Sequence, residues 1–324
     1  MEKTIARLLQ GVIPETTSRF TEKQLVYYEK VGESRGLRAR CLAGAYLGLK
    51  TSSPVIEIKL KLKGRARNKL GLDLEVDGQI IKCVRLELAP GQNLVTERLA
   101  ERPQSKEREI KIYLPVSVEV EIVSFSACGK PLPTAEEKLL CLGDSITQGM
   151  DATCPSCIYP TVLAKLIKAE CLNQGVGGQT FDPESLDASL PFSAKVVTVA
   201  YGVNDWFNNH SLKEIEENCL AYLERLRKIF PTAVIAVITP IWTSREDETK
   251  KAGTLQAVRN SIARIASWLN CFPVDGLALV PHHPFYFVDG IHPNESGHLL
   301  YGVNLFQSLS QFILQTKRSP TLWP

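Results

Sequence analysis

The sequence predicts an α/β protein in two parts, an antiparallel β-sandwich followed by a parallel sheet with helices on both faces. In the first part apolar and charged residues alternate, as in residues 55–63, which is the period of a half-buried strand. In the second part short apolar runs alternate with helically spaced segments, which indicates parallel strands joined by helices. A proline-rich connection at residues 129–134 separates the two patterns, so we predict domains at residues 1–133 and 134–324.

The first part is expected to begin with a short helix and to continue as strands. An amphipathic helix with a lead-in segment fits residues 1–20, and the period becomes two from Gln24 to about Ser126. Asp77-Gly78 supplies the positive φ angles of a hairpin turn. The predicted strands are residues 55–63, 70–76, 79–88, 110–114 and 116–123. Short strands with turn signals and no long helix favour an antiparallel sandwich of jelly-roll-like topology.

The second part alternates five predicted strands with helices. Pro160 stands near the first turn of one helix, where its missing N–H is harmless, and Ser211 is a suitable cap for the next. The predicted strands are residues 139–142, 170–173, 195–201, 233–239 and 271–274. The predicted helices are residues 159–167, 211–229, 254–269 and 295–315.

Composition argues against several classes of protein. The net charge of +3, without a basic stripe that carries interleaved aromatics, argues against a nucleic-acid partner. No apolar run approaches the ~20 residues that cross a bilayer, and the first ten residues contain charges, so we predict a cytoplasmic protein without a membrane partner. Nine scattered cysteines argue against a disulfide framework. The one close pair, Cys154 and Cys157, is expected to be free thiols, because a zinc site needs a second pair.

Ser145 is the candidate nucleophile. It follows the apolar run of residues 139–142 within Gly143-Asp144-Ser145-Ile146-Thr147. In open α/β sheets, ligands bind just beyond the carboxyl ends of the strands. Ser145 does not stand in a G-x-S-x-G elbow, because Thr147 follows where the second glycine is required, which disfavours an ordinary α/β-hydrolase. Because a serine needs a general base to act as a nucleophile, a histidine partner is expected elsewhere in the chain.

His292 is the candidate base, and Asp289, three residues earlier, is its candidate carboxylate. A carboxylate in this place can orient the ring and stabilise the imidazolium. The alternative is that Asp289 and Asn294 cap a turn and a helix while His292 lies on the surface. A metal site made of His282, His283, Asp289 and His292 is disfavoured, because prolines bracket the first two and no helical spacing relates them.

Two further stretches offer hydrogen-bond donors for a developing oxyanion. Gly177-Gly178 permits close approach of the backbone, and the amide of Asn204 follows the strand predicted at residues 195–201. Neither is specific alone, since glycines also make ordinary turns and Asn204-Asp205 can cap a turn. The glycine stretch is not a dinucleotide fingerprint, because Thr180 stands in the required glycine position.

In chain order, residues 143–147, 173–178, 202–205 and 289–292 resemble the four sequence blocks of the SGNH (GDSL) hydrolase superfamily, over about residues 136–317. The resemblance implies a flavodoxin-like three-layer α/β/α fold and no metal or organic cofactor. It implies a catalytic triad of Ser145, His292 and Asp289. It also implies an oxyanion hole made by the N–H groups of Ser145 and Gly178 (or Gly177) and the amide of Asn204. The preceding β-sandwich resembles the arrangement of family-2 carbohydrate esterases, which deacetylate sugars.

The predicted function is hydrolysis of a small-molecule acyl ester by a serine esterase, with acetyl on a carbohydrate as the preferred substrate. Asp144 and Trp206 are candidate substrate-binding residues, although Trp206 is equally suited to packing beside its loop. One alternative is a thioesterase or lysophospholipase for longer acyl chains. Another is a glycan-binding protein on an inactive hydrolase scaffold, which the complete Ser145, Asp289 and His292 set opposes. The oligomeric state stays open.

Overall fold

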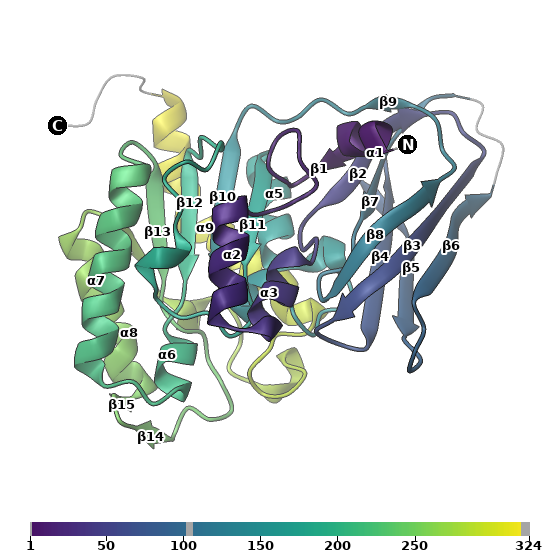
Figure 1. Cartoon of the computed structure of the whole chain (residues 1–324). Helices are drawn as coiled ribbons and strands as arrows, with labels where there is room; N and C mark the ends of the chain where they lie inside the picture. The colour runs from purple at the N-terminus through teal and green to yellow at the C-terminus, as the bar shows by residue number, and fades with distance from the viewer. Residues whose placement is uncertain (1, 102–105, 319–324) are drawn as a thin grey trace.

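The computed structural model describes residues 2–101 and 106–318, in which a β-rich part and an α/β part lie side by side (Figure 1). The β-rich part has two antiparallel sheets, ordered β1-β2-β7-β4-β5 with β9 beside β2, and β6-β3-β8. These strands are β1 (Leu9–Gln10), β2 (Tyr46–Thr51), β3 (Val55–Arg65), β4 (Lys69–Val76), β5 (Gln79–Glu87), β6 (Leu94–Glu101), β7 (Arg108–Tyr113), β8 (Val118–Phe125) and β9 (Lys130–Pro131).

Alternation of side chains builds the core between the two sheets. Ile56, Ile58 and Leu60 of β3 are fully buried, and they pack with apolar residues of the other sheet. Asp77 and Gly78 adopt φ angles of 48° and 84° in the turn between β4 and β5, as the hairpin prediction requires. The five predicted strands of this part are confirmed, whereas β1, β2, β6 and β9 were not predicted.

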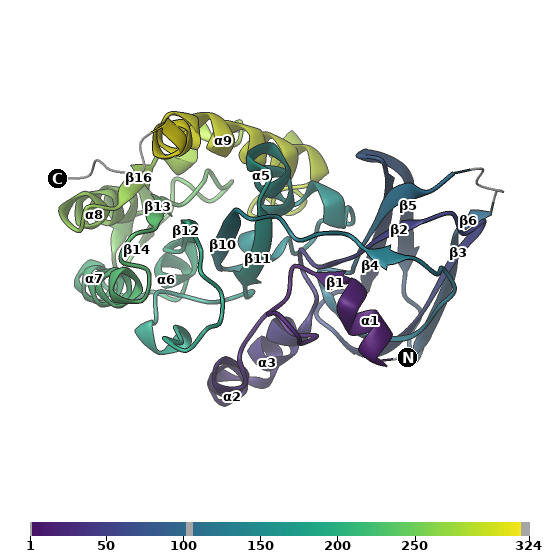
Figure 2. The same cartoon turned by 90° about the horizontal axis from the view of Figure 1, so that it is seen from above.

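Three helices precede β2, namely α1 (Glu2–Leu8), α2 (Glu22–Val31) and α3 (Glu33–Arg40), with β1 between the first two. The expectation of strand-like period two from Gln24 onward is wrong up to Arg40. Thr21 and Gln24 form a capping box, which starts α2. Gln24 also donates to Gln174 and to the carbonyl of Ser185 in the α/β part. Figure 2 shows α2 and α3 between the sandwich and the parallel sheet, and the domain division at residue 133 stays a prediction.

The α/β part is a three-layer sandwich around a parallel sheet of order β11-β10-β12-β13-β16, the flavodoxin-like order. Helices α5 and α9 pack on one face, and α7 and α8 pack on the other (Figure 2). The strands are β10 (Lys138–Gly143), β11 (Glu170–Gly175), β12 (Val196–Ala200), β13 (Val234–Ile238) and β16 (Phe272–Val274), and the helices are α5 (Tyr159–Ile167), α7 (Leu212–Ile229), α8 (Leu255–Trp268) and α9 (Glu295–Arg318). These elements match the predicted ones closely.

Strand register brings the predicted functional loops to one edge of the sheet. Gly143 at the end of β10 pairs with Gly175 of β11 and with Ala200 of β12, so the three strands end level. Two short helices follow these strand ends, α4 (Ser145–Gln148) after β10 and α6 (Val203–Phe207) after β12. Chemistry is therefore concentrated at the carboxyl edge of the sheet.

The structure also bears on two predictions from composition. All nine cysteines are free thiols. Among the described residues, no helix is both long and apolar enough to cross a membrane.

Candidate active site

Ser145 is the first residue of α4, directly after β10. Asp144 caps this helix by accepting a hydrogen bond of 2.9 Å from the N–H of Ile146. Gly149 ends it at a φ of 84°, where a Cβ would lie 2.4 Å from the side chain of Ile158. The strand end and the tight helix therefore fix the serine hydroxyl at the edge of the sheet.

The three residues predicted as a triad are brought together. The Oγ of Ser145 lies 2.9 Å from Nε2 of His292, and Nδ1 of His292 lies 2.7 Å from Oδ2 of Asp289. The other oxygen of Asp289 accepts the N–H groups of Ile291 and His292. Burial opposes the charge on Asp289, but these hydrogen bonds outweigh it and hold the pKa of the carboxyl well below its usual range. Asp289 is therefore ionised at neutral pH and faces the histidine ring.

The predicted oxyanion donors follow strands that end level with the strand before Ser145, and the structure distinguishes the two glycines. The N–H of Gly177 donates to Oε1 of Gln148 at 2.9 Å. The N–H of Gly178 has no acceptor among the residues that the structure describes. The amide of Asn204 donates to the carbonyl of Gln179 at 3.1 Å and to Asp144 at 3.3 Å. Gly178 is therefore the glycine whose N–H is free to receive an oxyanion.

The two candidate substrate-binding residues are both buried. Burial raises the pKa of Asp144 to about 7, although the hydrogen bond from the N–H of Ile146 acts to lower it. Trp206 is fully buried in the core, and its Nε1 donates to the carbonyl of Gly253 at 2.9 Å. The structure thus gives Trp206 the packing role rather than a place in the substrate pocket, whereas Asp144 lines a small cavity.

That cavity has a volume of about 20 Å³ and is lined by sequence neighbours of the candidate nucleophile and base, but not by Ser145 or His292 themselves. Asp144 and Ile146, which flank Ser145, and Ile291, which precedes His292, all line it. The other lining residues are apolar or aromatic except for two threonines, and they are Ala200, Tyr201, Val203, Ile238, Thr239, Pro240, Ile241, Trp242, Thr243 and Tyr301.

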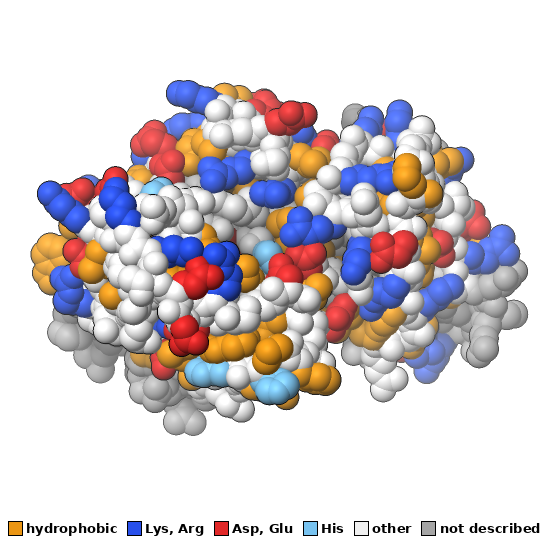
Figure 3. Space-filling view, turned by 90° about the horizontal axis from the view of Figure 1, so that it is seen from below, with side chains coloured by type: hydrophobic (Ala, Val, Ile, Leu, Met, Phe, Trp, Pro, Cys, Tyr) orange, Lys and Arg blue, Asp and Glu red, His pale blue; other side chains and the backbone are white. Residues whose placement is uncertain are grey.

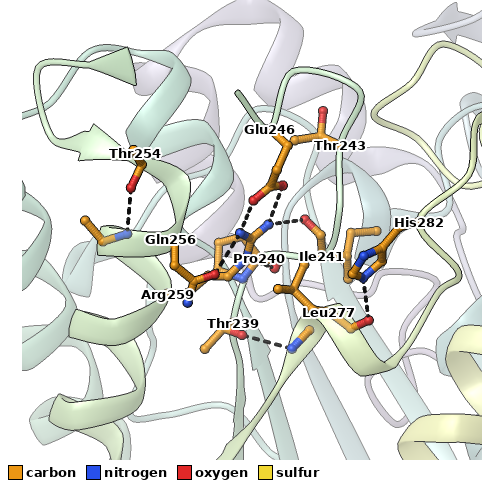
Figure 4. Close-up of polar contacts among 12 residues, drawn as sticks. Thr239, Pro240, Ile241, Thr243, Glu246, Thr254, Gln256, Arg259, Leu277 and His282 are labelled. Atoms are coloured by element: carbon orange, nitrogen blue, oxygen red, sulfur yellow. Dashed lines mark hydrogen bonds and ion pairs between the residues drawn. The ribbon is translucent and has the colours of Figure 1, made fainter. Parts of the chain in front are cut away.

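A buried arginine shapes the loop that forms one wall of this cavity (Figure 4). Arg259 of α8 donates to the carbonyls of Pro240 at 2.7 Å and Ile241 at 3.0 Å, and it pairs with Glu246. Thr243 in turn donates to the carbonyl of Gly290 at 3.0 Å, in the loop that carries Asp289 and His292. No local pattern in the sequence marks Arg259, because its partners lie in a different loop.

The first part of the chain also reaches the site, which the sequence did not predict. Arg67 forms a two-point ion pair with Asp151, at 2.6 and 2.8 Å. Asp151 lies 3.5 Å from Nδ1 of His292, so the guanidinium of Arg67 is one residue removed from the candidate base. Figure 3 shows this face as hollowed, with a histidine in the hollow and charged side chains around it.

Among the described residues, two groups have ligand atoms close enough to share a metal ion. One is Asp151, Asp289 and His292, and the other is Asp73, Cys83 and Cys154. Neither includes His282 or His283, so the disfavoured metal site from the sequence is not assembled. In each group an arginine already pairs with an aspartate, Arg67 with Asp151 and Arg85 with Asp73.

Residues 141–300 match the GDSL-like Lipase/Acylhydrolase family. With the parallel sheet and the serine at its edge, this places the second part of the chain in the class of SGNH (GDSL) hydrolases. The second part belongs to the GDSL-like lipase/acylhydrolase family, as the sequence blocks predicted, and the chain is a carboxylic ester hydrolase.

Solved structures share the fold over nearly the whole chain. A GDSL-like lipase from Bacteroides ovatus is 23% identical with a TM-score of 0.76, covering 95% of this chain and 96% of its own. A salicylyl-acyltransferase from a tetracycline biosynthetic pathway is 16% identical with a TM-score of 0.76, covering 94% of each. A family two carbohydrate esterase from Clostridium thermocellum, in complex with cellohexaose, is 15% identical with a TM-score of 0.64, covering 84% and 93%. No curated protein matches this chain.

Proposed function

We propose that this protein is a serine esterase that removes small acyl groups, acetyl above all, from a carbohydrate. The observation that carries the proposal is the line of hydrogen bonds from Asp289 through His292 to Ser145, at 2.7 and 2.9 Å. Nucleophile, base and orienting carboxylate within hydrogen-bond reach are what nucleophilic acyl transfer requires. The unoccupied N–H of Gly178 belongs to the loop after β11, which ends level with the strand that precedes Ser145.

In the proposed reaction, Oγ of Ser145 attacks the ester carbonyl while Nε2 of His292 takes its proton. Asp289 stabilises the imidazolium, and the carbonyl oxygen becomes a tetrahedral oxyanion. The N–H groups of Ser145 and Gly178 and the amide of Asn204 donate to that oxygen. The alcohol then leaves with the proton from His292. Water attacks the acyl-enzyme by the same route and releases the acid.

In this proposal the acyl group enters the cavity that Asp144, Ile146 and Ile291 line, which are sequence neighbours of Ser145 and His292. Its volume of about 20 Å³ gives room for about one water-sized group, which suits the methyl of an acetyl ester. The likeness to carbohydrate esterases supports a sugar as the alcohol, although fold alone does not choose a substrate.

The test is hydrolysis of a p-nitrophenyl ester series from acetate to octanoate. Ser145→Ala is expected to lose up to ~10⁶-fold in kcat, because the nucleophile is gone. Ser267→Ala, an exposed serine of α8 that bonds only its own helix, is the matched control and keeps full activity. Normal turnover by purified Ser145→Ala would disprove the mechanism.

The same series decides between acyl groups. Fast cleavage of the acetate ester with little activity on the octanoate ester supports the small-acyl proposal. Acetylated sugars would then be tested as substrates. A preference for longer chains would instead point to the thioesterase or lysophospholipase alternative. Tight glycan binding without Ser145-dependent turnover on any ester would point to a binding protein.

A further inference from the structure

Helix α3 carries three arginines, and they differ in their partners. Arg40 pairs with Glu29 at 2.6 Å and with Glu119 at 3.2 Å. Arg35 and Arg38 have no carboxylate within ion-pair distance among the side chains that the structure describes. They donate instead to backbone carbonyls of the α/β part. Two cations on one face of α3 are therefore left without a charged partner.

These two cations lie on the glycine loop beside the candidate nucleophile. Arg38 donates to the carbonyl of Gly177 at 2.8 Å, and Arg35 donates to the carbonyl of Gly178 at 2.7 Å. A Cβ on Gly178 would lie 3.3 Å from Nη1 of Arg38 and 3.7 Å from Nε of Arg35. The guanidinium groups therefore touch the residue whose N–H is proposed for the oxyanion hole.

A third arginine, Arg19, fixes α3 in this place. Its side chain is 1% exposed and donates to the carbonyls of Arg38 and Ala39 near the end of α3. It also donates to the carbonyl of Gly175, where β11 ends. Because one buried side chain joins the helix to the sheet, Arg35 and Arg38 are held on the glycine loop rather than left free in solvent.

The positive charge at this place is only partly offset. Burial lowers the pKa of Arg38, and the neighbouring charges of Arg67 and Arg35 lower it further. The Nε of Arg38 is buried and has no hydrogen-bond acceptor. Arg67 is neutralised by Asp151, but nothing on the described part of the chain neutralises Arg35 and Arg38. A bound anion that contacts the solvent-accessible N–H groups of Arg35 and Arg38 would supply the missing charge.

We propose that Arg35 and Arg38 form a subsite for an anionic oxygen group, a carboxylate or a phosphate, on the esterified substrate. This rests on the proposed esterase function, since it names the class of ester that the enzyme prefers. Guanidinium groups suit such ligands because their forked N–H groups match two oxygens at once. The preferred substrate is thus an acylated acidic sugar rather than a neutral one.

The experiment compares two esters that differ only in charge, triacetylated methyl glucuronide and its uncharged glucuronamide analogue. The wild type should show a higher kcat/KM for the acid. Arg35→Gln and Arg38→Gln should each reduce that preference by roughly tenfold, the effect of one charge-assisted hydrogen bond. A triacetylated methyl glucoside 6-phosphate, measured alongside, tells whether carboxylate or phosphate is the better anion.

Arg40→Gln is the matched control, because it removes the same charge from the same helix and should keep the preference. Arg35→Lys and Arg38→Lys keep the positive charge, so they should retain part of the preference for the acidic ester. Damage to the glycine loop would lower kcat/KM for both esters, so its effect cancels in the ratio of the two kcat/KM values. A wild type without preference for either anion, or a preference that survives both glutamine variants, overturns the subsite.

Calorimetric titration with unacetylated methyl glucuronide tests the subsite without turnover. Binding by wild type and by Ser145→Ala that is lost in Arg35→Gln supports the subsite even if no ester is cleaved. Absence of binding by both proteins overturns it if the activity measurements also show no preference. Persistent activity in Ser145→Ala, by contrast, contradicts the catalytic proposal alone.

Discussion

The two sides of the active-site hollow are built differently. On the α/β side, Ser145 and Asn204 stand within a few residues of strand ends, and local backbone geometry fixes them. On the other side, Arg35 and Arg38 arrive from a helix far away in the sequence, held by the buried Arg19. In our proposals the first side supplies groups that act on every ester, whereas the second supplies positive charge that contacts only anionic esters. This difference separates chemistry from recognition.

The largest expected effect lies on the α/β side and tests whether that side alone carries the chemistry. His292→Ala removes the proposed base, so kcat should fall by up to ~10⁶-fold on both charged and neutral esters. Steady-state kinetics on the two matched esters measure it. His283→Ala, at an exposed position that joins neither the triad nor the cavity, is the control. A loss confined to the acidic ester would contradict the separation of chemistry from recognition.

A smaller effect is expected from Asn204, the side-chain donor of the proposed oxyanion hole. Asn204→Ala should lower kcat by about 10²–10³-fold with little change in KM, because the amide stabilises charge that develops only in the transition state. The loss should be equal for the two matched esters. Asn260→Ala, an exposed amide on α8, serves as the control. If KM rises instead and kcat is unchanged, Asn204 binds the ground state and is not an oxyanion donor.

The contrast between the two sides explains what the sequence could predict. The candidate triad was predictable because Ser145 follows a strand whose apolar run can be recognised, and because Asp289 and His292 stand three residues apart in one short motif before α9. Helix α2 was missed because its start depends on the Thr21 and Gln24 capping box, which the alternating pattern downstream obscured. The place of Trp206 depends on packing with distant residues, so spacing alone could not decide it.

The arginine side had no local signature at all. Arg38 and Gly177 are 139 positions apart in the sequence, and Arg67 and Asp151 are 84 positions apart. Ion pairs and hydrogen bonds of this kind follow from how the two parts dock, which a single sequence does not encode in any periodicity. Arg259 is similar, since its role is visible only once α8 packs under the loop that carries Pro240.

The smallest expected effect concerns the free energy of unfolding. It tests the contrast between buried groups on the α/β side and partly solvated arginines on the other side. Asp144 is 2% exposed, and burial raises its pKa to about 7, whereas an unfolded aspartate titrates near ~3.9. Between these values the folded chain binds a proton that the unfolded chain does not. The proton on Asp144 therefore favours folding at low pH, and this contribution is lost as the pH rises through about 7.

Asp144→Asn cannot titrate, so it should remove this dependence. The unfolding free energy of the wild type minus that of the variant should fall between pH 5 and pH 8, by at most about 3 kcal/mol. Taking the difference cancels other titrating groups such as His298, whose pKa burial lowers to about 3. Asp275→Asn, at an exposed position, is the control and should give no such trend in urea unfolding. A difference that is constant with pH, or that rises, would mean that Asp144 is charged in the folded protein throughout this range, with Asn204 and the N–H of Ile146 satisfying it.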